Sequence, residues 1–184
     1  MNKKLYFLSI HVPQRLENEI LRLKREIKDR FQSEKALRLP GHVTLVRPTW
    51  IKEQLEGPLV AQVAAFLKDQ HPFSIELEDF GAFTPRTIYV KVTPNEHLTR
   101  IKHQLDQVVD QAIGAKEEGN LENKNFVPHI SIANRDLTPE HFQEAWREFQ
   151  KRRFKGSFQV REVHLLRHNR KRWEVLQVFP LCQV

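Results

Sequence analysis

Two tetrapeptides of this chain are near copies of each other and stand 87 positions apart: HVTL at His42–Leu45 and HISI at His129–Ile132. Each has a histidine, an aliphatic residue, a hydroxyl residue and a second aliphatic residue. Alternation of this kind is typical of a strand with one polar and one apolar face, so the histidine and the hydroxyl would share a face. The repetition predicts a fold with two similar halves, each contributing one such strand.

The segments around the two tetrapeptides follow the same order of elements. Around the first, the apolar pattern predicts a strand over Leu5–Val12, a helix over Gln14–Phe31, an end to the histidine strand at Pro48 and the stretch Lys52–Gly57, a helix over Leu59–Leu67 and a strand over Phe73–Leu77. Around the second, it predicts a strand over Thr87–Val92, a helix from Pro94 to Ile113, a polar loop over Gly114–Asn125, a helix capped by Thr138, and strands over Phe158–Leu166 and Trp173–Phe179. We therefore expect residues 1–184 to form a single domain of two pseudo-symmetric lobes that enclose one cleft.

Length and composition narrow the class of protein. With 184 residues and 40% hydrophobic content, the chain suits one well-packed domain. It has no long apolar run and no signal-like start, and its one cysteine, Cys182, cannot form an internal disulfide. These features predict a soluble, cytoplasmic protein without membrane association. The net charge of +7 favours anionic partners such as phosphates or RNA, although solubility alone can account for such a charge.

A facing pair of histidines can cleave a phosphodiester without a metal. One neutral imidazole takes a proton from water while a protonated one gives a proton to the departing oxygen, and a lone histidine cannot do both in one step. Because free histidine titrates near ~6.5, a coupled pair can hold one charged and one neutral member. Thr44 and Ser131, roughly 6–7 Å further along each strand, are expected to bind the phosphate oxygens. No cofactor is implied, and no HxH or HExxH pattern points to a metal site.

Either histidine motif alone would more readily indicate a half-buried structural residue, whereas two motifs at equivalent places in a repeat favour a paired functional site. The histidines expected to be structural or to lie on the surface are His11, His71, His97, His103 and His141. His164 and His168 flank the basic turn 167–172. With the adjoining Trp173, this turn could bind phosphates and stack a base, or it could be a solvated hairpin.

The motifs and their flanks resemble the two-histidine (2H) phosphoesterases, a family that includes RNA 2',3'-cyclic phosphodiesterases and 2'-5' RNA ligase-like proteins. The second motif, FVPHISI over Phe126–Ile132, is very similar to the family's aromatic-x-Pro-His-x-Thr/Ser-aliphatic form. PRTIYVKV over Pro85–Val92 and EVLQVFPL over Glu174–Leu181 resemble its central and last strands. The resemblance implies an α+β, bilobal, internally duplicated fold, in which antiparallel sheets line a central cleft with helices outside. It also implies that His42 and His129 are catalytic.

The chain departs from the family just after each motif. Many relatives carry an arginine at the position of Asn134, with Arg135 here one place later, and an aromatic-Leu-Gly run where this chain has Val46-Arg47-Pro48. We therefore consider Arg47 and Arg135 as candidates for substrate binding. Tyr89, on the predicted central strand, is a further candidate, with sheet packing as the alternative.

The expected function is that of a metal-independent phosphodiesterase that opens the 2',3'-cyclic phosphate of an RNA terminus or a small cyclic nucleotide to a 2'-phosphate. One alternative is a module that binds a nucleotide or RNA end without turnover. Another is 2'-5' RNA ligation, which is the same chemistry in the reverse direction. No oligomeric state is predicted, and Trp50 and Trp146 are expected to be packing residues.

Overall fold

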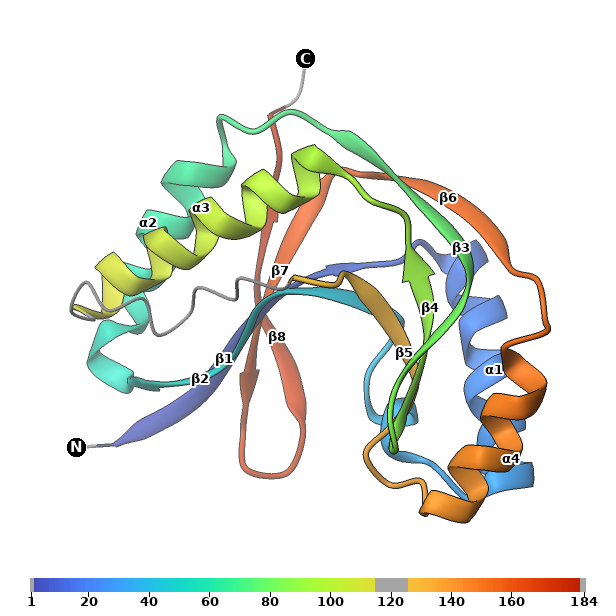
Figure 1. The fold of residues 1–184 in the computed structure, drawn as a ribbon. Coiled ribbons are helices and arrows are strands. Elements are labelled where there is room, and N and C mark those ends of the chain that lie inside the picture. Colours follow the sequence, from blue (N-terminus) through green and yellow to red (C-terminus); the bar gives the residue numbers. More distant parts are fainter. Residues whose placement is uncertain (1, 115–125, 183–184) are drawn as a thin grey trace.

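The computed structural model describes residues 2–114 and 126–182, so most of the polar loop expected over Gly114–Asn125 lies outside the described residues. Over these ranges the chain forms eight strands and four α-helices, and the strands make two four-stranded antiparallel sheets (Figure 1). The predicted α+β class with antiparallel sheets is therefore confirmed. In these described ranges, no helix is both long and apolar enough to cross a membrane.

The two sheets have the same internal order. The first consists of β2 (His42–Lys52), β1 (Lys3–His11), β7 (Glu162–His168) and β8 (Trp173–Pro180), in that order. The second consists of β5 (His129–Asn134), β4 (Thr87–Val92), β3 (Phe73–Phe83) and β6 (Lys155–Val160). In each sheet the histidine strand forms one edge. It pairs with the strand that comes before it in the chain, and one α-helix connects the two. This matching order supports an internal duplication, and the single pseudo-symmetric domain stays a prediction.

Helices cover the outer face of each sheet, and the chain exchanges two of them between the lobes. The helix α1 (Gln14–Phe31) follows β1 of the first sheet but packs with α4 (Pro139–Phe149) on the second. Conversely, α3 (Glu96–Ile113) follows β4 of the second sheet but packs with α2 (Glu56–Leu67) on the first. Figure 1 shows the result as an arch with the helices outside. We call the face of each sheet that the helices leave uncovered its inner face.

The helices form where the periodic pattern predicts them. Their apolar stripes are buried, as the near-zero exposure of Ile20 and Ile27 in α1 and of Leu98 and Leu105 in α3 shows. The side chain of Thr138 accepts a hydrogen bond from the backbone N–H of His141, which confirms the predicted cap of α4. Short 3-10 turns over Lys35–Arg38 and Glu53–Leu55 lead into β2 and α2.

The structure corrects one predicted strand and fixes the end of another. The run Phe158–Leu166 is not one strand, because β6 ends at Val160 in the second sheet and β7 begins at Glu162 in the first. The alternation of apolar residues breaks at this crossing, where Arg161 and Glu162 are two exposed polar residues in succession. The first histidine strand continues through Pro48, and it ends at Lys52, where the predicted stretch Lys52–Gly57 begins. Pro48 is tolerated there because β2 is an edge strand with a register shift at this point, where no partner needs its missing N–H.

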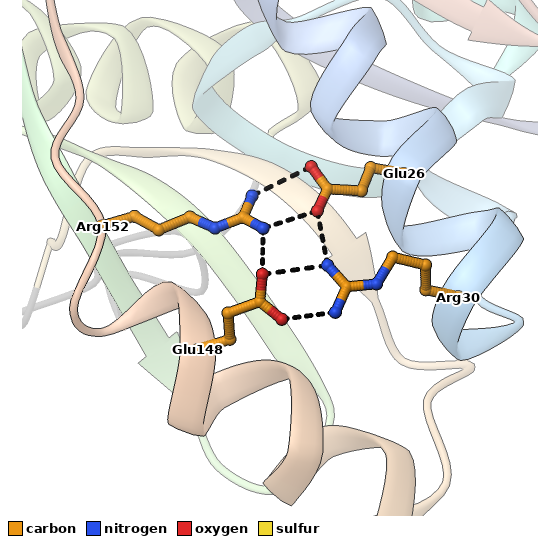
Figure 2. Close-up of polar contacts among 4 residues, drawn as sticks. All are labelled: Glu26, Arg30, Glu148 and Arg152. Atoms are coloured by element: carbon orange, nitrogen blue, oxygen red, sulfur yellow. Dashed lines mark hydrogen bonds and ion pairs between the residues drawn. The ribbon is translucent and has the colours of Figure 1, made fainter.

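A network of two glutamates and two arginines joins α1 to the end of α4 (Figure 2). Arg30 of α1 contacts Glu26 at 2.7 Å and Glu148 at 2.5 Å, and Arg152 contacts Glu26 at 2.6 Å and also pairs with Glu148. Hydrogen bonds from Arg30 and Arg152 lower the pKa of the Glu148 carboxyl to about 2. Because these side chains are partly exposed, each pair adds little to stability, and the network acts mainly by fixing the two helices together.

Candidate active site

His42 and His129 occupy equivalent positions, each as the first residue of an edge strand. Their strands, β2 and β5, contact each other where the two sheets meet. The Nδ1 of His42 lies 2.8 Å from the carbonyl oxygen of Pro40, and the Nδ1 of His129 lies 2.7 Å from that of Val127. A carbonyl oxygen can only accept, so each Nδ1 carries the hydrogen. The two imidazoles are therefore held in the same tautomer, with Nε2 as the nitrogen that can exchange a proton with a ligand.

Burial favours the neutral form of both imidazoles. Burial is the largest cause that lowers the pKa of His42, to about 4, and Lys24 and His129 also lower it. The hydrogen bond to the Pro40 carbonyl raises this pKa, but by less than burial lowers it. Burial also lowers the pKa of His129, and the hydrogen bond to the Val127 carbonyl raises it by less. A positive charge on His129 also disfavours the charged form of His42. An anion bound between them would favour a protonated imidazole.

Side chains of α1 hold the short segment that leads into His42. The ammonium of Lys24 donates to the carbonyl of Leu39 at 2.8 Å, and the backbone N–H of Gly41 donates to a carboxylate oxygen of Glu17 at 2.6 Å. Lys24 is only 2% exposed, and burial lowers its pKa to about 8. A Cβ at Gly41 would lie 2.9 Å from the Glu17 carboxylate and 3.0 Å from Val12, so a larger residue would displace the carboxylate that Gly41 binds.

Aromatic rings pack against both histidines. The rings of Tyr89 and Phe83 each lie 4.9 Å from that of His129 and 4.5 Å from each other. On the other sheet, the ring of Phe7 lies 5.6 Å from that of His42. Tyr89 is 7% exposed and lies over Gly81, where a Cβ would come within 2.5 Å of its ring. The structure thus brings Tyr89 to the predicted site, where it packs against a histidine.

The two hydroxyl residues lie on the histidine strands, two positions after each histidine. Thr44 pairs with Ser9 of β1, and Ser131 pairs with Tyr89 of β4. Both are half-buried. Within residues 2–114 and 126–182, neither hydroxyl hydrogen-bonds to another group, so both can turn toward a ligand.

Arg47 lies in the middle of β2, and Arg135 lies just past the end of β5. Both are exposed, and each follows its histidine by five or six residues, which is roughly 15–20 Å at the rise of a strand. Arg135 adopts a left-handed conformation with a φ of 64°, just past the end of β5, and its backbone N–H donates to the carbonyl of Arg86 at 2.9 Å. The structure therefore places the backbone of each arginine well away from the histidine of its own strand.

His11 and His164 are close to the site, which the sequence did not indicate. The ring of His11 lies 6.3 Å from that of His42 and stacks on that of His164 at 4.0 Å, with only 7° between the ring planes. Among the described residues, the Nε2 of His11, the Nδ1 of His164 and the Oγ of Ser9 are buried without a hydrogen-bond partner. Burial lowers the pKa of His11 to about 3, and His164 and His42 contribute to this shift. In the described part of the chain, no group of three or more His, Cys, Asp or Glu side chains is arranged to hold a metal ion.

Comparisons with known proteins agree with this geometry. The family model described as the 2'-5' RNA ligase superfamily matches residues 12–172. A protein of Oceanobacillus iheyensis named "Putative phosphoesterase" is 26% identical over 182 residues, a match that covers 96% of this chain and 97% of the relative. A protein of Geobacillus kaustophilus with the same name is 27% identical over 177 residues, covering 95% and 94%.

Solved structures with similar folds cover nearly the whole chain. The structure of E. coli LigT complexed with 3'-AMP has a TM-score of 0.74 at 19% identity and covers 99% of this chain and 100% of that chain. TT0787 of Thermus thermophilus has a TM-score of 0.68 at 18% identity and covers 97% of each chain. These likenesses concern the fold, while the family rests on the sequence match over most of the chain. The chain belongs to the 2'-5' RNA ligase superfamily, the group of two-histidine phosphoesterases that its paired motifs resemble.

Proposed function

We propose that this protein is a phosphodiesterase that opens the 2',3'-cyclic phosphate of an RNA terminus or a small nucleotide and leaves a 2'-phosphate. The observation that carries the proposal is the matched pair of imidazoles, which present Nε2 from equivalent positions on two contacting strands. Membership of the superfamily, and relatives named as phosphoesterases, support hydrolysis of a phosphoester. LigT structures with 3'-AMP and ATP are consistent with a nucleotide as the substrate.

The reaction requires one proton to leave water and one to reach the ribose. The oxygen of water forms a bond to phosphorus as its proton passes to the neutral imidazole, and the bond between phosphorus and O3' breaks as the protonated imidazole gives its proton to O3'. After the reaction, the imidazole that acted as the base is protonated and the one that acted as the acid is neutral. Proton exchange with water restores the original protonation states. No electron transfer and no metal ion are needed for this balance.

We assign His42 as the base and His129 as the acid. Lys24 disfavours a positive charge on His42, whereas the pKa of His129 is governed by its burial and by its bond to Val127. When the phosphate anion is bound, the proton that it recruits is therefore held more favourably on His129. A substrate with a 4-nitrophenolate leaving group needs no protonation, so the His129→Asn variant should be much less impaired on it than His42→Asn.

Thr44 and Ser131 are proposed to donate hydrogen bonds to the non-bridging phosphate oxygens. Each lies on the polar side of a histidine strand and has a free hydroxyl. Hydrogen bonds from such donors become stronger as negative charge develops on the phosphate oxygens in the transition state. In other enzymes, the removal of one such donor lowers kcat by about a hundredfold. Thr44→Val and Ser131→Ala keep the approximate volume and remove the donor.

The test is hydrolysis of 2',3'-cyclic nucleotides and of cyclic-ended oligonucleotides in the presence of a chelator. His42→Ala and His129→Ala should each lower kcat/KM by about a hundredfold or more. The control is His71→Ala, which removes an exposed imidazole. Unchanged turnover in both histidine variants would overturn the mechanism. Saturable binding of a cyclic nucleotide that the wild-type protein never consumes would favour a binding module, and formation of a 2'-5' linkage from two RNA ends would favour ligation.

A further inference from the structure

A pocket opens on the inner face of the first sheet, apart from the two histidines. A row of four residues crosses all four strands, because Leu5 pairs with Trp50 on one side and His168 on the other, and His168 pairs with Trp173. All four line a pocket of about 800 Å³, within the range of ligand-binding cavities. Trp50 is 64% exposed, which corrects the expectation that it is a packing residue.

The rim of this pocket carries uncompensated positive charge. It includes Lys3, Lys4, Arg167 and Arg170. Two of these charges are already satisfied, since Lys4 pairs with Glu53 and Arg167 pairs with Glu56. In the part of the chain that the structure describes, Lys3 and Arg170 are exposed and make no ion pair. An aromatic floor with free cations at its edge is suited to a nucleobase and its phosphate, because every base can stack and every phosphate is anionic.

The pocket is connected to the site by a chain of aromatic contacts. The ring of Phe7 lies 4.6 Å from that of Trp173 and 5.6 Å from that of His42. The inner wall of the pocket is therefore within about 10 Å of the His42 ring. The outer wall is farther, because the partner of Trp50 lies six residues along β1 from the partner of His42, roughly 20 Å at the rise of a strand. One nucleotide with its phosphate at the histidines cannot also fill the outer part.

We propose that this pocket binds the nucleotides on the 5' side of the cyclic phosphate, and that the preferred substrate is a single-stranded RNA end rather than a free nucleotide. The inference rests on the proposed function, since it takes the cyclic phosphate to lie between His42 and His129. In a strand that ends in a 2',3'-cyclic phosphate, every other nucleotide lies 5' of the reacting one. Trp50 stacks a base, and Lys3 and Arg170 contact the connecting phosphates. The basic turn 167–172 thus forms one rim of an RNA site.

The kinetic experiment compares a cyclic-ended trinucleotide with a cyclic mononucleotide. The wild-type protein should have a higher kcat/KM for the trinucleotide. Trp50→Ala should reduce that value roughly five- to hundredfold, the range for loss of one stacked base, and leave the mononucleotide unchanged. Trp50→Phe keeps a ring and should preserve most of the preference. Because Trp50 is exposed, both variants should melt like the wild type.

A binding experiment makes the pocket testable apart from catalysis. Affinities are measured for a trinucleotide ending in a 2'-phosphate and for a nucleoside 2'-phosphate, over a range of salt concentrations. Lys3→Ala and Arg170→Ala should each weaken trinucleotide binding and lower its salt dependence by about one counterion. Lys151→Ala, at an exposed position after α4, is the charge-matched control.

The outcomes separate the two proposals. If neither cyclic substrate is hydrolysed, the proposed function fails, and tighter binding of the trinucleotide through Trp50 would still support the RNA site. If both are hydrolysed with equal kcat/KM, or if Trp50→Ala changes neither turnover nor binding of the trinucleotide, the RNA site is refuted while the proposed function stands.

Discussion

The carboxylate of Glu17 accepts a hydrogen bond at 2.6 Å from the backbone N–H of Gly41, the residue immediately before His42. This bond links the first turn of α1, which packs on one sheet, to the start of β2 in the other. His42 thus takes its position from a helix of the opposite lobe. The consequence is that changes in α1 should affect catalysis without touching the substrate.

Glu17→Ala should therefore lower kcat by roughly ten- to a hundredfold with little change in KM, because a displaced imidazole loses its alignment with the reacting atoms. Glu17→Gln keeps an acceptor oxygen and should retain most of the activity. Steady-state kinetics with a cyclic nucleotide provide the measurement, and Glu19→Ala on the same helix is the control. Equal effects of Glu17→Ala and Glu17→Gln would argue that the hydrogen bond does not position His42.

Acid should destabilise the fold through His11 and His42. Their folded pKa values, about 3 and about 4, lie below the value of ~6.5 for a free histidine. Between pH 6.5 and these values the unfolded chain binds more protons than the folded chain, so the free energy of unfolding is at its full value above pH 6.5 and falls as the pH drops toward 4 and 3. Urea unfolding across this range should show a smaller loss for His11→Asn than for the wild type. His71→Asn should follow the wild-type curve.

Gly81 should tolerate no larger residue while Tyr89 is present. Gly81→Ala would place a Cβ within 2.5 Å of the Tyr89 ring, which itself packs against His129. We expect a loss of about 1–3 kcal/mol in the free energy of unfolding, together with lower kcat. In a Tyr89→Ala background the clash is absent, so the same substitution should cost much less stability. An equal cost in both backgrounds would show that the clash is relieved elsewhere.

The network of Glu26, Arg30, Glu148 and Arg152 should contribute modest, salt-sensitive stability. Glu148→Gln is expected to lower the free energy of unfolding by about 1 kcal/mol or less at low salt, and by a smaller amount near 1 M salt, where the Debye length falls to about 3 Å. Glu144→Gln, at an exposed position on the same helix, is the matched control. A loss that does not depend on salt would indicate that Glu148 acts by packing.

Local pattern was sufficient to predict most helices and strands and both histidine motifs. Alternation placed His42 and Thr44 on one face of a strand, and the cap at Thr138 followed from its residue type. Local pattern does not show which strands pair when they are distant in the sequence. The stacking of His11 on His164 depends on β1 pairing with β7. The alternation breaks at Arg161 and Glu162, but a break in the pattern does not show that the chain passes to the other sheet there. For the same reason, the row that unites Trp50 with Trp173 became visible only in the structure.

The central claim is that His42 and His129 act as one catalytic unit, and a double-mutant cycle tests it most directly. The measured quantity is kcat/KM for a cyclic-ended trinucleotide with wild type, His42→Asn, His129→Asn and the double variant. If the two imidazoles act in the same step, the double variant should be little slower than the worse single variant, because either loss already disables the proton transfer. Rate losses that simply multiply would show that the two histidines act independently, and would contradict the paired mechanism.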